Sequence, residues 1–135
     1  LIMNEAVIVL LTLSYSLILG IIVAQVILTA PVVFKVLDNE NASKFLRAIF
    51  PRYYLLLFLI CLVVSLISYL WFSAIDTWIA LTASMLAFIG FIIIPVTNSA
   101  RDRGWNKLFK ILHNISVLNT IILFIIAVAQ LVRIS

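Results

Sequence analysis

The sequence has 135 residues, of which 66% are hydrophobic and only 10% are charged, and its mean hydropathy is +1.32. A soluble domain has about 25% charged residues, and a chain this apolar would leave large hydrocarbon surfaces in water. The composition therefore excludes a water-soluble fold. It predicts an all-α membrane protein, because a helix satisfies its own backbone hydrogen bonds in lipid.

The net charge of +4 could suggest a partner of opposite charge, such as nucleic acid. The basic residues, however, fall mainly in two short segments that flank apolar runs. These eight residues are Lys35, Lys44, Arg47, Arg52, Arg101, Arg103, Lys107 and Lys110. This placement favours anionic lipid headgroups, so we expect a lipid bilayer as the partner and no nucleic acid.

Four apolar runs each reach the length of about 20 residues that a helix needs to cross a bilayer. They cover residues 6–30, 53–73, 77–96 and 108–132. We expect Pro31 to end the first span and Pro51 to begin the second. The short connection at 73–76 makes the second and third spans an antiparallel hairpin. The sequence thus predicts a single domain over 1–135, a four-transmembrane-helix bundle.

The segment before the second span has apolar residues at helical spacing, opposite Lys44 and Arg47. These apolar residues are Phe45, Leu46, Ile49 and Phe50. Ser43 is suited to cap such a helix. The pattern predicts a short interfacial helix over 43–50, in the first cytoplasmic loop, with its apolar face toward lipid or protein.

The charged residues lie outside the centres of the four runs, so the sequence predicts no buried carboxylate of a proton relay. The positive-inside rule places the two basic loops in the cytoplasm and both termini outside. Aromatic rings are expected at headgroup level on both sides of the membrane. We place Trp71 and Trp78 at the outer side, and Tyr53, Tyr54 and Trp105 at the inner side.

Small residues recur every three or four positions in three of the spans. The stripes are Thr12, Ser16, Gly20 and Ala24, then Cys61, Ser65 and Ser68, then Ala80, Ala83, Ala87 and Gly90. Such stripes let helix backbones approach closely. We expect them to pack inside the protomer, with a homo-oligomer contact as the alternative.

The last span carries the most polar residues. His113, Ser116 and Thr120 fall within an arc of roughly 60°, with Asn119 and Gln130 at its edge. Such a stripe should face the bundle, where neighbouring helices can satisfy it. Our leading hypothesis is a non-enzymatic protein that binds or passes a small ligand at His113, Ser116, Asn119 and Thr120. The alternative is an accessory or purely structural subunit of a respiratory or transport assembly.

Asn98, Arg101 and Asp102 follow Pro95, which interrupts the backbone hydrogen bonds of the third span. We expect a structural clasp between the two basic loops, with Arg101 paired to Asp102 or to Asp38. The alternative is a site for a lipid headgroup or another anion.

Three interpretations of His113 are open: a structural residue, a member of a substrate or proton path, or a ligand of haem b or copper. Ligation would need a second donor, either Met3, Met85 or Cys61, or His113 of another subunit. No metal cluster is indicated. No catalytic residue is indicated either, because Asp76 is expected across the membrane from His113.

Residues from both basic loops and from the second, third and fourth spans together resemble one family. They are Pro31, Phe34, Lys35, Leu37, Phe50, Pro51, Tyr53, Tyr54, Pro95, Asn98, Arg101, Asp102, Phe109, Lys110, Leu112, His113, Ser116 and Asn119. The chain resembles the uncharacterised four-helix membrane family that includes transmembrane protein 205, domain of unknown function 4149. The resemblance implies four spans and an inner or plasma membrane location. The histidine is also similar to that of copper-resistance and haem-handling four-helix modules, which implies the metal or haem alternative.

Overall fold

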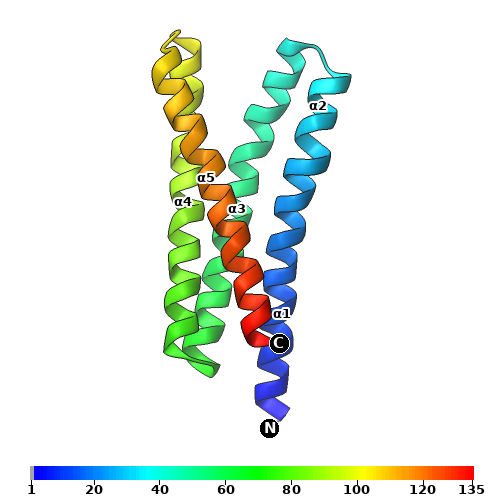
Figure 1. The fold of residues 1–135 in the computed structure, drawn as a ribbon, viewed down its shortest axis with the longest axis vertical. Helices are drawn as coiled ribbons and strands as arrows, with labels where there is room; N and C mark the ends of the chain where they lie inside the picture. The colour runs from blue at the N-terminus through cyan, green and yellow to red at the C-terminus, as the bar shows by residue number, and fades with distance from the viewer. Residues whose placement is uncertain (1) are drawn as a thin grey trace.

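The structure, a computed structural model, describes the backbone of residues 2–135 and the side chains from Asn4 onward. Helices run up and down along one axis (Figure 1). They are α1 (Ile2–Val23), η1 (Ala24–Thr29), α2 (Ala30–Val36), α3 (Asn39–Trp71), α4 (Ala74–Asp102) and α5 (Asn106–Ile134). α1, η1 and α2 form one continuous rod, so the described residues contain four helices long and apolar enough to cross a membrane. The prediction of an all-α four-helix membrane bundle is confirmed.

The bundle has two chemically different ends. Both chain termini and the α3–α4 hairpin lie at one end, which we call the terminus end (Figure 1). The α2–α3 and α4–α5 connections lie at the other, which we call the basic end. Helices of 33 and 29 residues are about 50 and 43 Å long. They exceed the hydrocarbon core of about 30 Å, so their ends project into the headgroup region.

The expectation that Pro31 ends the first span is wrong. A π-helical segment, Ala24–Thr29, precedes the proline, and the Ala30 N–H bonds to the carbonyl of Gln25, five residues back. This wider turn takes the backbone out of α-helical register just before Pro31, which has no N–H to donate. The helix therefore continues to Val36.

The segment 43–50 is helical, but the separate interfacial helix and a helix start at Pro51 are both wrong. Residues 39–71 form one helix with Pro51 in its interior. The cap is Asp38, whose carboxylate accepts from the Asn41 N–H at 3.0 Å, and not Ser43. Pro51 has no N–H for the carbonyl of Arg47, four residues back, yet the helix continues through it, and Arg52 Nη1 bonds to the neighbouring carbonyl of Ala48 at 2.6 Å.

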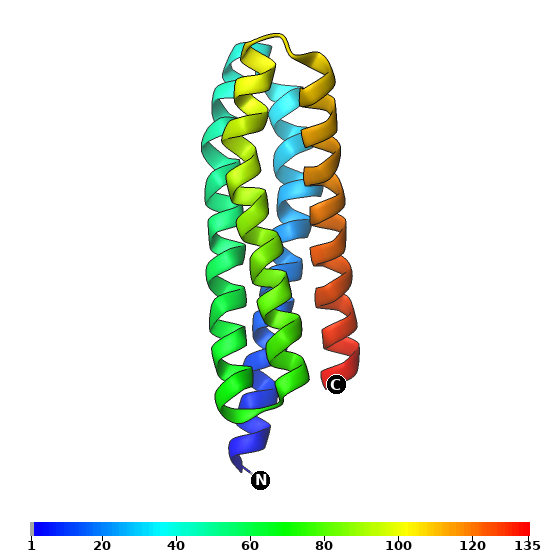
Figure 2. The same cartoon turned by 90° about the vertical axis from the view of Figure 1, so that its left-hand side faces the viewer.

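Two of the three small-residue stripes pack inside the protomer, as predicted. Figure 2, viewed from the side of α4, shows α4 running between α3 and α5. The stripes of α3 and α4 are buried: Cys61, Ser65, Ser68, Ala80, Ala83, Ala87 and Gly90. The small side chains let α3 and α4 form the most extensive helix contact of the bundle.

The stripe of α1 faces outward, which corrects the prediction of packing within the protomer. Ser16, Gly20 and Ala24 are exposed and Thr12 is half-buried. The buried face is instead formed by Val7, Leu11, Tyr15, Ile18 and Ile22. α1 meets α3 and α5 through these large side chains, so a close approach of backbones is not needed there.

Candidate functional site

One group of hydrogen bonds between helices lies near the middle of the bundle. The Tyr54 hydroxyl of α3 bonds to Thr120 Oγ1 at 3.1 Å and to the carbonyl of Ser116 at 3.3 Å, both on α5. Asn119 Nδ2 donates to the carbonyl of Leu86 on α4 at 2.7 Å. Side chains of the last span, as the sequence predicted, thus lie against two neighbouring helices.

Gln25, in the rod formed by α1, η1 and α2, lies near the same depth of the bundle. Gln130 Nε2 of α5 lies 3.5 Å from the Tyr15 hydroxyl of α1, which sets these two residues at one level. Gln25 comes ten residues after Tyr15, and Thr120 comes ten before Gln130. Both steps lead about 15 Å toward the basic end. Gln25 is buried and lies near the axial level of Thr120, in a segment whose main contacts are with α1 and α2.

These residues lie near one axial level of the bundle. We define the polar layer as Gln25, Tyr53, Tyr54, Ser116, Asn119 and Thr120. The π-helical segment begins one residue before Gln25. Such segments inside helices are frequent at functional sites.

Four polar atoms of the layer are buried without a hydrogen-bond partner among the described residues. They are Gln25 Nε2, the Tyr53 hydroxyl, Ser116 Oγ and Asn119 Oδ1. Another buried polar atom without a partner among the described residues, Ser84 Oγ, lies outside the defined layer, on α4 two residues from Leu86. Buried polar atoms in proteins are nearly always paired, so each such atom needs an explanation.

Tyr53 and Tyr54 do not lie at headgroup level, which corrects the sequence-based placement. Both are buried, at 5% and 1% exposure. Their ring centroids are 4.9 Å apart at an edge-on angle. They were misplaced because the second helix begins at Asn39 and not at Pro51, which puts them about four turns inside it.

His113 lies on the outside of the bundle, contrary to the expectation that it faces inward. It is exposed, and its ring stacks on Phe109 with centroids 5.9 Å apart. Arg101 covers the same Phe109 ring, with its guanidinium carbon 5.6 Å from the centroid. His113 precedes Thr120 by seven residues, or about 10 Å, so it lies outside the polar layer.

The surroundings of His113 do not fit a haem or copper site within one protomer. Cys61 comes seven residues after Tyr54 and His113 seven before Thr120, which separates them by about 20 Å along the axis. Met85 is exposed on α4, and the Met3 side chain lies outside the described residues. Among the described residues, no group of three or more His, Cys, Asp or Glu side chains is placed to hold a metal ion.

A second polar cluster, at the terminus end, was missed from the sequence. Asp76 is only 2% exposed and forms an ion pair with Arg133 of α5. Its carboxylate also accepts from Gln130 Nε2 at 2.9 Å and from the hydroxyl of Ser73. The cluster fastens the end of α5 to the start of α4, with Tyr15 of α1 beside it.

Asp76 lies outside the centres of the four apolar runs, but its burial at the start of α4 was not predicted from the sequence. The signal was present in the hairpin, because Ser73 and Asp76 have the spacing of a capping box. The Asp76 N–H indeed bonds to Ser73 Oγ at 3.2 Å. Capping holds the carboxylate at the helix start, where Gln130 and Arg133 reach it.

The basic end does contain a clasp, but the expected pairing of Arg101 is wrong. Asp102 pairs with Arg47, through contacts of 2.8 Å from Nη1 and 2.5 Å from Nη2. This joins the start of α3 to the end of α4. Asp38 caps α3, Arg101 lies over Phe109, and Asn98 is half-buried on α4.

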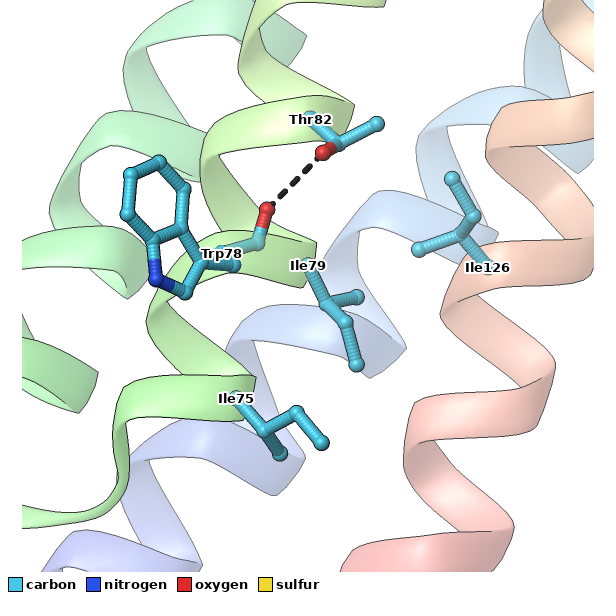
Figure 3. A pocket seen from close by; sticks show the side chains of 5 residues that line it. All are labelled: Ile75, Trp78, Ile79, Thr82 and Ile126. Atoms are coloured by element: carbon cyan, nitrogen blue, oxygen red, sulfur yellow. Dashed lines mark hydrogen bonds between the residues drawn. The ribbon is translucent and has the colours of Figure 1, made fainter.

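Two apolar grooves lie on the surface of the bundle. One, of about 270 Å³, is lined by Ile75, Trp78, Ile79, Thr82 and Ile126 between α4 and α5 (Figure 3). Its Thr82 hydroxyl bonds to the carbonyl of Trp78 at 2.9 Å. The other, of about 500 Å³, is lined by Leu28, Thr29, Val32, Val33, Val36, Leu37 and Phe45. Their mainly hydrocarbon linings suit lipid chains better than a polar ligand.

Comparison with known proteins gives one family match. The family model described as Domain of unknown function (DUF4149) matches residues 13–106, more than two thirds of the chain. No curated protein and no solved structure matches the chain. The matched residues include Gln25, Tyr53 and Tyr54 of the polar layer and end at the first residue of α5.

Proposed function

We propose from the geometry that the chain is an integral membrane protein that binds a small molecule in the polar layer. The chain belongs to the DUF4149 family, a domain of unknown function. The family membership confirms the resemblance found in the sequence. The observation that supports the proposal is the set of four unpartnered polar atoms, on Gln25, Tyr53, Ser116 and Asn119, near one depth of the bundle.

The energetic argument starts from the cost of these atoms. A buried donor or acceptor without a partner costs about 1–3 kcal/mol, and lipid supplies no water in exchange. The cost of one such atom is tolerable, but the costs of four atoms in one layer add and destabilise the folded state. A bound molecule that hydrogen-bonds to them removes the cost.

The proposal is for binding without chemical conversion. Among the described residues, the polar layer contains amides and hydroxyls and no carboxylate, lysine or histidine. Histidine is the commonest general acid or base, and the phenols of Tyr53 and Tyr54 are the groups of the layer that belong to the wider set of such residues. Amides and hydroxyls are instead suited to holding a ligand in one orientation.

Removing single hydroxyls tests whether the layer is occupied. Tyr53→Phe and Ser116→Ala each delete one atom that has no partner in the described structure. If a bound molecule uses these atoms, each variant should lower the unfolding free energy by about 1 kcal/mol, the net value of a hydrogen bond. The measurement is thermal or denaturant unfolding of the full chain in lipid nanodiscs.

The control is Ser68→Ala, which removes another buried, unpartnered hydroxyl. Ser68 lies on α3, fourteen residues or about 21 Å from Tyr54. This variant should leave stability unchanged or raise it. An increase in stability for Tyr53→Phe and Ser116→Ala as well would show that the layer is empty, and the proposal would be withdrawn.

We also propose that the protein lies in an inner (plasma) membrane with its basic end in the cytoplasm, in contact with anionic headgroups. The support is the concentration of Lys and Arg in two short connections. A cysteine introduced at Asn39, the first residue of α3, should then be protected from an impermeant thiol reagent in intact cells. Labelling at that position before lysis would reverse the orientation.

A second candidate function is that of a subunit in a homo-oligomer or larger membrane complex. The observation that favours it is the outward-facing stripe of α1, where a Cβ added to Gly20 would meet no atom within 4 Å. Native mass spectrometry after gentle extraction tests it directly. Recovery of the free monomer alone would count against this function.

A further inference from the structure

The basic end carries its free positive charge mainly on one side. In the connection between α2 and α3, Lys44 pairs with Glu40 at 2.8 Å. Between residues 101 and 110, at the other connection, the one acidic residue is Asp102, and Arg47 of α3 engages it through two contacts. Four cations of this second connection therefore have no carboxylate partner among the described residues: Arg101, Arg103, Lys107 and Lys110.

A tight turn brings these four cations to one level of the bundle. Gly104 has a φ of 71°, which glycine adopts without strain. The Trp105 N–H bonds back to the carbonyl of Ala100 at 2.9 Å, and α5 begins at the next residue, Asn106. The last turn of α4 and the first turns of α5 thus lie side by side.

Aromatic rings hold the two guanidinium groups in place. The guanidinium carbon of Arg101 lies 5.6 Å from the Phe109 ring centroid, and that of Arg103 lies 5.0 Å from the Trp105 ring. Stacking on a ring occupies the face of a guanidinium and leaves the N–H donors at its edge available. The His113 ring stacks on the same Phe109 ring at 5.9 Å, so Arg101 and His113 meet at one aromatic side chain.

One exposed face of α5 adds further polar groups. At about 100° per residue, Asn106, Lys110 and His113 fall within an arc of roughly 60°, and Asn114 lies about 40° beyond Lys110. All four side chains are exposed. Polar side chains of membrane-spanning helices ordinarily face the inside of a bundle, where other helices satisfy them. An exposed polar face therefore needs a partner outside the protein.

The order of residues along this face follows the order of groups in a phospholipid. α5 has 29 residues, so a centred helix extends about 7 Å beyond each boundary of a hydrocarbon core of about 30 Å. Lys110, about 6 Å from the helix start, lies at headgroup level. Asn114, about 6 Å deeper, lies just inside the core, where the glycerol esters are in reach. Val117 and Ile121, both exposed, continue the same face with hydrocarbon.

We propose that this face of α5, together with Arg101, is a binding site for one anionic glycerophospholipid. The phosphate lies at Arg101 and Lys110, the glycerol ester at Asn114, and an acyl chain along Val117 and Ile121. The inference rests on the headgroup contact proposed above and assigns that contact to one site. A free phosphate would use the cations alone, whereas a lipid also uses the amide and the apolar residues below it.

The test identifies the lipids that stay bound to the full chain. The chain is placed in nanodiscs of equal parts phosphatidylglycerol and phosphatidylcholine with the same acyl chains, and native mass spectrometry counts the lipids retained on release. Each Lys or Arg near a membrane surface favours an anionic lipid by about fivefold. Phosphatidylglycerol should therefore be retained at least about fivefold over phosphatidylcholine. Equal retention of the two lipids would overturn the site.

A matched pair of double variants separates a site from diffuse attraction. Arg101→Gln with Lys110→Gln should reduce the preference for phosphatidylglycerol by at least about fivefold. The control, Lys35→Gln with Arg52→Gln, removes the same charge from the same end and should keep most of the preference. All four side chains are exposed, so folding does not depend on them. An equal loss in the control would show diffuse attraction, and the site would be wrong.

Two further measurements distinguish a lipid from a soluble phosphate. Asn114→Leu changes no charge and should lower the retention of phosphatidylglycerol by about twofold or more, since it removes a hydrogen bond. An excess of glycerol 3-phosphate should leave the lipid bound. Displacement of the lipid by glycerol 3-phosphate, or unchanged retention in Asn114→Leu, would contradict a lipid held at both levels.

Failure of this site is distinguishable from failure of the proposed function. Both faces of a nanodisc are open to solution, so lipid retention does not depend on orientation in the cell. Labelling of the cysteine introduced at Asn39 would reverse the orientation and leave the lipid site standing. Equal retention of the two lipids would remove the site and leave both the orientation and the polar layer untouched.

Discussion

Replacing Gly90 with alanine is expected to destabilise the bundle by about 1–3 kcal/mol, the usual cost of overpacking a core. A Cβ at this position would lie 2.3–2.8 Å from three atoms of the Tyr54 ring. The ring cannot move away easily, because Tyr54 is 1% exposed and its hydroxyl is bonded to α5. The measurement is denaturant unfolding in a mild detergent.

Gly20→Ala is the matched control for this prediction. The same methyl group there meets no atom within 4 Å, and alanine is the better helix former by about 1 kcal/mol. Gly20→Ala should therefore leave stability unchanged or raise it. Equal effects of the two substitutions would contradict the close approach of α4 to Tyr54, and with it the geometry of the polar layer.

Arg133→Ala is the second large expected effect. It leaves the buried carboxylate of Asp76 without its countercharge, although Ser73 and Gln130 still donate to it. Breaking a fully buried ion pair costs about 3–5 kcal/mol. The Arg133 side chain is 47% exposed, so solvent screening reduces the expected loss to about 1–3 kcal/mol. Unfolding of the full chain in nanodiscs measures it.

Two further variants separate charge from packing at this cluster. Adding Asp76→Asn to Arg133→Ala removes the stranded charge and should restore part of the lost stability. Asp102→Asn breaks the pair at the basic end, where the side chains of Arg47 and Asp102 are 35% and 57% exposed, and should cost less than Arg133→Ala. If the double variant were no more stable than Arg133→Ala, the loss would come from packing and not from the unpaired carboxylate.

The helices could be predicted from the sequence because lipid imposes a simple condition on length and hydrophobicity. Each of the four apolar runs lies in a helix of the structure, apart from small differences at the ends of the runs. The larger errors arose at Pro31 and Pro51, where a local rule for proline was applied. Both prolines lie inside helices, because tertiary packing and a π-helical turn support the backbone around them.

The polar layer could be predicted only in part. Ser116, Asn119 and Thr120 share one region of a single helix, so helical periodicity indicated them. Gln25, Tyr53 and Tyr54 lie on other helices, and which of their faces turns inward depends on how the helices pack. Tyr53 and Tyr54 also matched the aromatic belt of a membrane boundary. The sequence-based prediction therefore placed them at that boundary and not inside the bundle.

His113 shows the limit of periodicity as a guide to burial. It shares a helix face with Ser116 and Thr120, yet it is exposed while they are half-buried. α5 packs against α4 and α1, whereas α2 packs against η1 and α3. Figure 1 shows α5 and α2 diverging toward the basic end. The face of α5 is therefore less covered at His113 than deeper in the bundle.

The most direct measurement is a high-resolution experimental structure of the full chain in lipid nanodiscs. Density for a bound molecule within hydrogen-bond distance of Gln25 Nε2, the Tyr53 hydroxyl, Ser116 Oγ and Asn119 Oδ1 is the predicted result. A layer in which these four atoms bond to one another, with no density between them, would contradict the account of the polar layer as a binding site.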